Sequence, residues 1–474
     1  MSQPKPLART GSGVLRGVEI DGVACFRGVP YAGPTARWCP PAPPVPWVGE
    51  RAATSWAADC PQQPWETAAT RAPDLDEDCL TLNVWTPSCD PGAALPVLVW
   101  FYGGSYLFGS ATDPRCDGAT FARKGVVLVT VNYRVGLFGF FSHPQLTAGS
   151  ANGSSGNLGL LDAIAALRWV REHIAAFGGD PASITAFGVS AGSASLSLLA
   201  CSPLAAGCFD RLILQSPGAF RPLASLADAD AAGLAVGEDI DELRRLPTAE
   251  LLARTGRLVP KVRALTAPRV LRPIRDGWII PLDERDAYAS GRFHAVPTLV
   301  GSNADEGTSL TAAWQVELEG LLRANFPGDP DGARRLFGTV AEAFGDSQFN
   351  LGARGVARAM AAAGKPAWRY VFTRRRPGRS DGPHHGDEVA YVFGRPGHGG
   401  APVDAHDHDL AEQMQDAWIR FAATGDPNGG ALPAWPRYDA AADAHLRFDR
   451  EISIGSGWRR EQLDFLDAYL EEHR

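Results

Sequence analysis

Apolar residues occur along this chain in two arrangements, which predict strands and helices respectively. Residues 126–131 form a continuous apolar run, as in a strand that is covered on both faces. Residues 159–177 place apolar side chains at helical spacing until Gly178-Gly179-Asp180-Pro181. Further strands are predicted at residues 80–85, 97–101, 183–186, 211–215, 298–300 and 368–373, and a further amphipathic helix at residues 410–422. Because strands that alternate with helices pair in parallel, we predict an α/β protein with a central, mostly parallel twisted sheet flanked by helices.

Two segments are predicted to decorate this sheet. Residues 13–31 alternate apolar and polar side chains, which predicts an N-terminal β-meander. Residues 223–275 are rich in Leu, Ala and Arg, which predicts a helical cap insertion. The length of 474 residues exceeds the usual size of one domain, but large α/β enzymes reach it by additions to one core. A single domain over residues 1–474 is therefore expected, with two domains as the alternative.

Composition and charge narrow the classes of function. Hydrophobic residues make up 45% of the chain and charged residues 21%, as in globular proteins. The formal net charge of -8 argues against nucleic acid as the main partner. The chain shows no secretory h-region and no apolar stretch of membrane-spanning length, so a cytoplasmic protein without membrane contact is expected. The eight cysteines lack metal-ligand spacing, and Cys60 with Cys79 is the one pair considered for a bridge.

The segment Gly188-Val189-Ser190-Ala191-Gly192 carries the clearest chemical signal. It lies between the β-prone residues 183–186 and the helix-compatible residues 194–200, which is the setting of a nucleophile elbow. A serine on such a turn has the free N–H groups of a helix N-terminus behind it, where an oxyanion can bind. The same five-residue pattern recurs at Gly378-Arg379-Ser380-Asp381-Gly382, but there it lies in a run predicted to be an exposed loop. Ser190 is therefore favoured over Ser380 as a nucleophile.

A serine nucleophile needs a base, and the base needs an orienting carboxylate. In an α/β-hydrolase the acid and then the histidine follow the nucleophile, each on a loop after a later strand. The predicted strand at residues 298–300 leads to Asp305 and Glu306, and the predicted strand at residues 368–373 is followed by His384 and His385. Spacing alone leaves both choices open.

Several motifs resemble those of the type-B carboxylesterases, which include the cholinesterases and the bacterial para-nitrobenzyl esterases. The resemblance extends from Gly13 to about Tyr469. It implies the α/β-hydrolase fold and ester hydrolysis through an acyl-enzyme. The motifs that carry it are Phe26-Arg27-Gly28-Val29-Pro30-Tyr31-Ala32, Glu77-Asp78-Cys79-Leu80-Thr81-Leu82-Asn83-Val84-Trp85, Asn132-Tyr133-Arg134, Gly156-Asn157-Leu158-Gly159-Leu160-Leu161-Asp162, Phe177-Gly178-Gly179-Asp180-Pro181 and Thr424-Gly425-Asp426-Pro427-Asn428.

The resemblance also implies a catalytic triad. Ser190 matches the nucleophile of the family, Glu306 in Asp305-Glu306-Gly307 matches the acid, and His385 in His385-Gly386-Asp387-Glu388 matches the base. Asp305 is then expected to be a solvated carboxylate, and His384 a loop histidine.

The oxyanion hole is implied by the same resemblance, with two departures from the family pattern. Its backbone N–H donors would come from Ala191 and from Gly104 and Ser105, in a loop similar to the triple-glycine loop of the family. Ser105 stands where the third glycine is usual, and Val189 stands where the family usually has a glutamate. We expect the loss of that carboxylate to affect deacylation and the pH optimum. Cys60 and Cys79 match positions that family members outside the cytosol join as a disulfide; thiols are expected here.

The expected function is hydrolysis of neutral carboxylic esters without a cofactor. Tyr106 and Phe108, which follow the oxyanion loop, and Val189 are the candidate pocket residues. No metal is expected, because His406-Asp407-His408-Asp409 is better explained as the cap before an amphipathic helix. The alternatives are an amidase or carbamate hydrolase with the same triad, and a catalytically inactive binding homologue. The sequence leaves the physiological substrate and the oligomeric state open.

Overall fold

The computed structural model of the chain describes residues 5–33, 35–64, 70–260, 268–326 and 328–473. The described residues form an 11-stranded sheet in the order β14-β13-β12-β11-β10-β9-β7-β8-β6-β4-β3. All pairs from β8 through β13 are parallel, and the pairs at the two edges are antiparallel. The strands are β3 (Val18–Ile20), β4 (Val23–Pro30), β6 (Thr81–Thr86), β7 (Leu95–Phe101), β8 (Val127–Val131), β9 (Gly179–Val189), β10 (Arg211–Gln215), β11 (Thr298–Asn303), β12 (Ala367–Phe372), β13 (Ala444–Phe448) and β14 (Ser453–Ser456). This mixed, mostly parallel sheet confirms the predicted α/β fold class.

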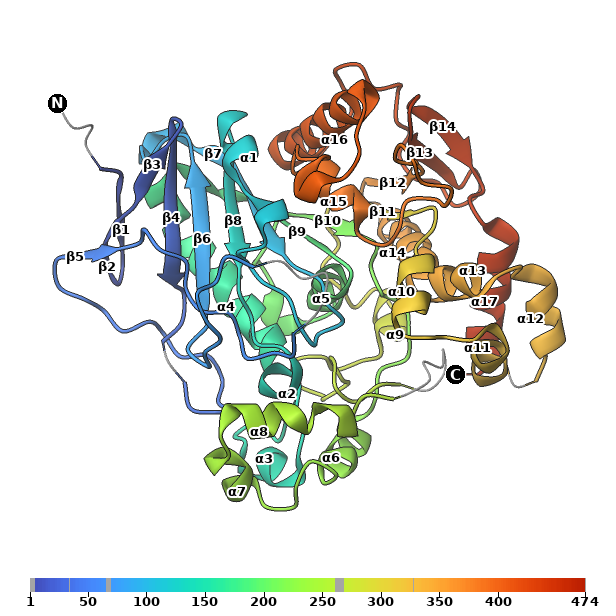
Figure 1. Cartoon of the computed structure of the whole chain (residues 1–474), viewed down its shortest axis with the longest axis horizontal. Helices are drawn as coiled ribbons and strands as arrows, with labels where there is room; N and C mark the ends of the chain where they lie inside the picture. The colour runs from blue at the N-terminus through green and yellow to red at the C-terminus, as the bar shows by residue number, and fades with distance from the viewer. Residues whose placement is uncertain (1–4, 34, 65–69, 261–267, 327, 474) are drawn as a thin grey trace.

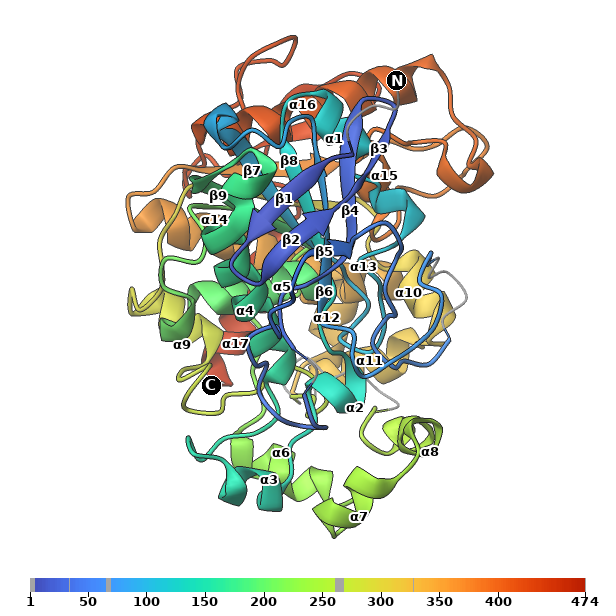
Figure 2. The same cartoon turned by 90° about the vertical axis from the view of Figure 1, so that its left-hand side faces the viewer.

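Both faces of the sheet are covered, as the continuous apolar runs predict. Successive side chains of β7 point to opposite faces, so Val99 joins one core and Trp100 joins the other. The first core includes side chains of α4 (Leu158–His173), α5 (Ala191–Ala200) and α14 (Leu351–Ala362), and the second includes those of α1 (Ala119–Arg123), α15 (Asp387–Val392) and α16 (Ala405–Thr424). Helices α4 and α16 accordingly lie on opposite sides of the sheet (Figures 1 and 2).

A second, three-stranded sheet lies at the N-terminal end of the molecule (Figure 2). It consists of β1 (Leu7–Thr10), β2 (Gly13–Arg16) and β5 (Glu50–Ala52). Strands β3 and β4, which follow directly, instead join the edge of the large sheet. The segment predicted as one meander therefore contributes strands to both sheets.

The segment after β10 is helical only in its first part. Helices α6 (Leu226–Gly233), α7 (Ile240–Arg245) and α8 (Thr248–Ala253) lie together at the lower end of the molecule in Figure 1, beside α3 (Pro144–Gly149). Residues 261–267 lie outside the described residues. Residues 268–275 contain no helix, so the prediction is wrong there. Pro268 and Pro273 explain this, since proline disfavours the helical conformation of the residue before it.

A smaller apolar core lies at the side of the molecule that carries α17 (Arg460–Glu472), on the right of Figure 1. The other helices that contribute to it are α11 (Leu318–Asn325), α12 (Pro330–Leu336), α13 (Val340–Gly345) and the first residue of α14, Leu351, with α10 (Thr308–Ala313) packed against it. The remaining α-helices of the described residues are α2 (Gly136–Gly139) and α9 (Glu284–Ala289). Whether these parts form a single domain with a cap, as expected, stays a prediction.

Helix α16 begins earlier than its apolar pattern predicts. Asp404 caps it by accepting from the Asp407 backbone N–H, and the Asp407 side chain accepts from the Asp404 N–H in return. The segment His406-Asp407-His408-Asp409 therefore lies inside the first turns of the helix and does not precede it. The Asp407 carboxylate is buried and bound to Arg374 (2.6 Å) and to the Tyr391 hydroxyl (2.7 Å).

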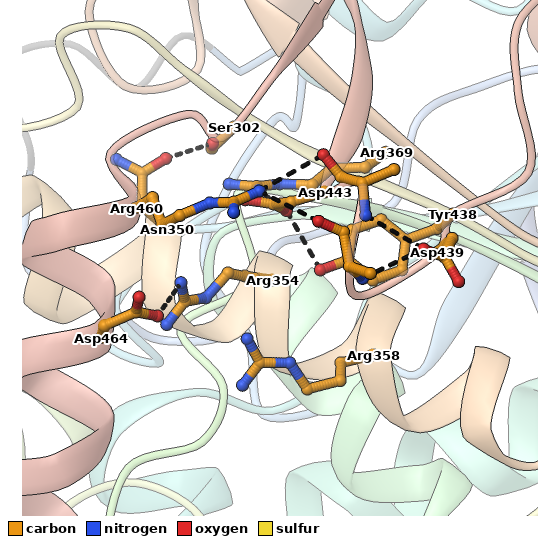
Figure 3. A network of polar contacts seen from close by, with 12 residues as sticks. Ser302, Asn350, Arg354, Arg358, Arg369, Tyr438, Asp439, Asp443, Arg460 and Asp464 are labelled. Carbon is orange, nitrogen blue, oxygen red and sulfur yellow. Dashed lines mark hydrogen bonds and ion pairs between the residues drawn. The ribbon is translucent and has the colours of Figure 1, made fainter.

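Two buried arginines form ion pairs between neighbouring segments of the chain (Figure 3). Arg369 on β12 pairs with Asp443 at 2.7 Å, and Asp443 also accepts from the Tyr438 hydroxyl at 3.0 Å. Arg354 on α14 pairs with Asp464 of α17 at 2.6 Å. The fold tolerates these buried charges because each one has an oppositely charged partner. Removing one partner would leave an uncompensated buried charge.

Candidate active site

Ser190 lies on a strained turn between the end of β9 and the start of α5. Its backbone has φ 56° and ψ -121°, a conformation that residues with a side chain rarely adopt. A Cβ on Gly188 would lie 2.6 Å from the carbonyl oxygen of Phe101, and one on Gly192 would lie 2.2 Å from the same oxygen. Only glycine fits at both positions, which is the local geometry expected of a nucleophile elbow.

Ser380, the second serine with the same flanking pattern, has a different setting. It is exposed in a loop between β12 and α15, and no helix follows it directly. The structural context therefore separates the two serines as the sequence predicts.

His385 and Glu306 are joined by a hydrogen bond. The distance between His385 Nδ1 and Glu306 Oε2 is 2.6 Å. Glu306 is 1% exposed, and its other oxygen accepts from the Ser216 hydroxyl (2.6 Å) and from the Asn303 backbone N–H (2.7 Å). These donors satisfy the buried carboxylate, which could not otherwise stay charged away from water. The ring of Phe349 stacks on the imidazole, with 4.1 Å between ring centroids.

The second ring nitrogen of His385 is available for chemistry. Within the described part of the chain, His385 Nε2 is buried and has no hydrogen-bond partner. His385 and Ser190 line the same cavity, which has a volume of about 700 Å³. The structure thus brings Ser190, His385 and Glu306 to one place, although no hydrogen bond joins the serine and the imidazole among the described contacts. Such contacts are often long in the absence of substrate.

Asp305 and His384, the neighbours that spacing left open, are bound elsewhere. Asp305 accepts from the Thr308 hydroxyl (2.7 Å) at the start of α10, and His384 Nε2 lies 2.5 Å from Asp381 Oδ2. Both residues are partly exposed, and Asp305 is also hydrogen-bonded to Thr308. The ligand atoms of Asp305, Asp381 and His384 lie within 4.8 Å of one another. Arg379 also pairs with Asp381 (3.3 Å), so this cluster already holds a cation.

The loop after β7 lies directly against the elbow. A Cβ on Gly103 would lie 2.9 Å from the Ser190 Cβ. Gly104, Ser105 and Tyr106 all have positive φ, at 121°, 57° and 66°. Ala191 is the first residue of α5, where backbone N–H groups have no partner within the helix. The predicted donors Gly104, Ser105 and Ala191 line the same cavity as Ser190, and Ser105 adopts a positive-φ conformation that glycine would favour. Their role as an oxyanion hole stays a prediction.

The three predicted pocket residues, Tyr106, Phe108 and Val189, all line the cavity. Val189 is 9% exposed and packs in the apolar core that also holds Trp100 and Phe187. Sequence reasoning missed further lining residues, because they come from segments far apart in the chain. They include Phe349, Trp314 and four arginines, Arg115, Arg221, Arg269 and Arg272.

Glu388 is a buried carboxylate in the motif that contains His385, and the sequence alone predicts no role for it. It accepts from the Asn303 side chain (2.5 Å) and from the Gln215 side chain (3.1 Å). Burial, and then the charge of Glu306, raises the pKa of Glu388 to about 7. Although Val189 provides no carboxylate, Glu388 places one near the triad.

Cys60 and Cys79 are both buried thiols in the structure. A hydrogen bond with Cys60, together with burial, holds the pKa of the Cys79 thiol well above its usual value. Within the described ranges, no helix combines the length and the apolar character that a membrane crossing requires.

Comparison with known proteins places these features in a family. The sequence model of the carboxylesterase family matches residues 4–326 and 315–466. The fumonisin B1 esterase of Sphingopyxis macrogoltabida is 42% identical over 96% of this chain and 88% of its own length. The para-nitrobenzyl esterase of Bacillus subtilis is 34% identical over 94% of this chain and 96% of its own length.

A solved structure agrees with these matches. The carboxylesterase EST55 of Geobacillus stearothermophilus superimposes with a TM-score of 0.83 at 33% identity, covering 96% of this chain and 99% of that one. The chain therefore resembles this carboxylesterase in its whole α/β-hydrolase fold as well as in its sequence. The chain belongs to the carboxylesterase family and is a carboxylic ester hydrolase of the serine type.

Proposed function

We propose that the chain hydrolyses carboxylic esters through an acyl-enzyme on Ser190, with His385 as the base and Glu306 as the residue that orients it. Ser190 Oγ attacks the ester carbonyl carbon while His385 Nε2 takes the hydroxyl proton. The carbonyl oxygen becomes an oxyanion, which the backbone N–H groups of Gly104, Ser105 and Ala191 stabilise.

The second half of the reaction uses the same groups. His385 returns the proton to the departing alcohol oxygen, which leaves the acyl group on Ser190. A water molecule, deprotonated by His385, then attacks the acyl carbon and releases the carboxylic acid. Glu306 keeps its negative charge throughout and stabilises the imidazolium that forms twice in the cycle.

The observation that best supports the proposal is the hydrogen bonding of the two ring nitrogens of His385. One ring nitrogen of His385 is held by the buried Glu306 at 2.6 Å, while the other has no partner among the described residues. His385 and Ser190 line the same cavity. This arrangement supports a proton acceptor for the serine hydroxyl.

A labelling experiment tests the assignment of the nucleophile. A fluorophosphonate probe followed by peptide mapping is expected to modify Ser190, and Ser190→Ala is expected to abolish both labelling and ester hydrolysis. Ser380→Ala is the matched control, because it removes the serine of the second five-residue pattern and should change neither. A label on Ser380, or none on Ser190, would refute the proposal.

A substrate panel separates the alternatives. Nitrophenyl esters of increasing acyl length, assayed beside matched anilides, distinguish an esterase from an amidase. Labelling of Ser190 without turnover of any member would indicate the inactive binding homologue. Because the relative at 42% identity is named for fumonisin B1, that compound belongs in the panel. The cytoplasmic location and the absence of nucleic-acid partners stay predictions from the sequence.

A further inference from the structure

Four arginines line the cavity that contains Ser190 among the described residues, and three of them, Arg221, Arg269 and Arg272, come from two separate segments after β10. Arg221 follows β10, whereas Arg269 and Arg272 lie on the irregular segment that precedes α9. Arg221 and Arg272 are only 5% and 6% exposed. Guanidinium groups keep their positive charge at any physiological pH, so this part of the cavity is strongly cationic.

The acidic side chains that line this cavity in the described part of the chain are bound to arginines other than Arg272. They are Asp113 and Asp387, and each already pairs with another arginine. Asp113 binds Arg115 at 2.7 Å, and Asp387 binds Arg379 at 2.7 Å. Neither one forms an ion pair with the three arginines in the described part of the chain.

Arg272 contacts an aromatic ring and no described polar group. Its guanidinium lies over the ring of Tyr106, with 5.4 Å between its Cζ and the ring centroid. Among the described residues it forms no hydrogen bond or ion pair, and its Nε is buried without a partner. A buried guanidinium that lacks an anion is costly, so an anion supplied by a ligand would stabilise this arrangement.

Glu284 is a buried carboxylate outside the cavity lining that interacts electrostatically with Arg272, but its hydrogen bonds are to other groups. Its oxygens accept from the Ser197 hydroxyl (2.5 Å) and from the Phe220 backbone N–H (2.7 Å). Burial raises the pKa of Glu284 to about 7, so the residue carries only part of a negative charge at neutral pH. It therefore does not replace the missing anion.

We propose that the cavity binds esters that carry a free carboxylate, and that Arg272, with Arg221 and Arg269, forms the subsite for that carboxylate. The planar guanidinium fork matches the two oxygens of a carboxylate, and the cavity of about 700 Å³ holds this group and the scissile ester together. The inference rests on the proposed function and narrows its substrate class. From the sequence alone a neutral ester is expected, because the candidate pocket residues Tyr106, Phe108 and Val189 carry no charge.

Matched pairs of esters test this subsite on either side of the scissile bond. On the acyl side, monomethyl glutarate is compared with methyl pentanoate, which has the same chain length without the charge. On the alcohol side, 4-acetoxybutanoate is compared with pentyl acetate. Titration of released acid gives kcat/KM for each, and we expect the charged ester of one pair to be favoured by about 10-fold or more, since hydrogen bonds to charged groups contribute about 1.5–3 kcal/mol.

Substitution of Arg272 decides whether the arginines cause that preference. Arg272→Gln is expected to lower the ratio of charged to neutral kcat/KM by about 10-fold or more. Arg275→Gln is the matched control: this residue is exposed on the same segment, and its loss should leave the ratio unchanged. If Arg272→Gln does not fold, Arg269→Gln, whose side chain is less buried, decides in the same way.

The outcomes distinguish this inference from the proposed function. Hydrolysis of the neutral esters with labelling of Ser190, but without any preference for a carboxylate, would overturn the subsite alone. A preference that survives in Arg272→Gln would overturn it as well. Failure to hydrolyse any ester of either pair would instead count against the proposed function.

Discussion

Glu388 and Glu306 are bound by the same residue. The Asn303 backbone N–H donates to Glu306 Oε1 at 2.7 Å, and the Asn303 side chain donates to Glu388 Oε2 at 2.5 Å. Both carboxylates are buried, and the charge of Glu306 contributes to raising the pKa of Glu388 to about 7. Ionisation of Glu388 near pH 7 therefore changes the electrostatic potential at His385.

Glu388→Gln is expected to change the pH dependence of stability. Because the folded-state pKa of Glu388 is about 7 and its ordinary value is 4.5, the folded state retains a proton that the unfolded state loses. The stabilisation is complete below pH 4.5 and is lost as the pH rises through 7, by on the order of 3 kcal/mol. The variant should therefore gain stability relative to the parent between pH 5 and pH 8, as urea unfolding at the two pH values would show.

The rate profile distinguishes Glu388 from a merely buried acid. Its ionised form favours the protonated imidazole of His385, so Glu388→Gln should move the acidic limb of kcat/KM to lower pH. Glu284→Gln is the matched control, since the pKa of Glu284 is also about 7, but among the described contacts its partners Ser197 and Phe220 do not bind Glu306, whereas Asn303 binds both Glu388 and Glu306. Equal shifts in both variants would contradict a specific effect of Glu388.

Val189→Glu is expected to speed deacylation. Val189 pairs with Gln215 across β9 and β10, and the Gln215 side chain donates to Glu388. A new carboxylate there would lie close to the triad and could organise the attacking water, which we expect to raise the deacylation rate by about 10-fold. Burst kinetics with a nitrophenyl ester measures acylation and deacylation separately.

Val189→Gln keeps the shape of the new side chain without its charge and serves as the control. Both variants should lower stability, by about 1–3 kcal/mol, because they bury a polar group in an apolar core. If Val189→Glu changed neither the deacylation rate nor the pH profile, the missing glutamate would have no bearing on turnover.

The sequence predicts the parts of this molecule that local pattern controls. Apolar runs locate the strands of the parallel sheet. The glycines around Ser190 locate the elbow, because a tight turn sterically restricts the residues beside the serine. The choice between Asp305 and Glu306 came from family resemblance, since two adjacent carboxylates have the same spacing. Their different partners depend on contacts with residues such as Ser216, which no local pattern reveals.

The cavity could not be predicted in the same way. Arg221 and Arg272 are separated by a helical segment, and only the folded chain brings them beside Ser190. The helical prediction failed over residues 268–275, where prolines override the composition of the segment, and this is where two of the arginines lie. Long-range packing, and not propensity, determines which side chains face a substrate.

Ser105→Gly is expected to stabilise the fold with little effect on catalysis. Ser105 has φ 57°, and a side chain in this region costs about 1–2 kcal/mol, which glycine avoids. The proposed oxyanion donor is the backbone N–H, so kcat should change by less than about 3-fold. Ala206→Gly, at an exposed position with φ -54°, should instead lower stability. A 100-fold loss of kcat in Ser105→Gly would show that the serine hydroxyl takes part.

Gly192→Ala is expected to disrupt the elbow. The added Cβ would lie 2.2 Å from the Phe101 carbonyl oxygen and 2.5 Å from that of Tyr102, and neither backbone oxygen can rotate away as a side chain would. We expect a loss of stability of about 3 kcal/mol, together with much slower labelling of Ser190 by a fluorophosphonate. Gly149→Ala is the control, because nothing lies within 4 Å of its added Cβ at the end of α3. If Gly192→Ala kept the stability and labelling rate of the parent, the close approach of β7 to α5 would not determine the position of the nucleophile.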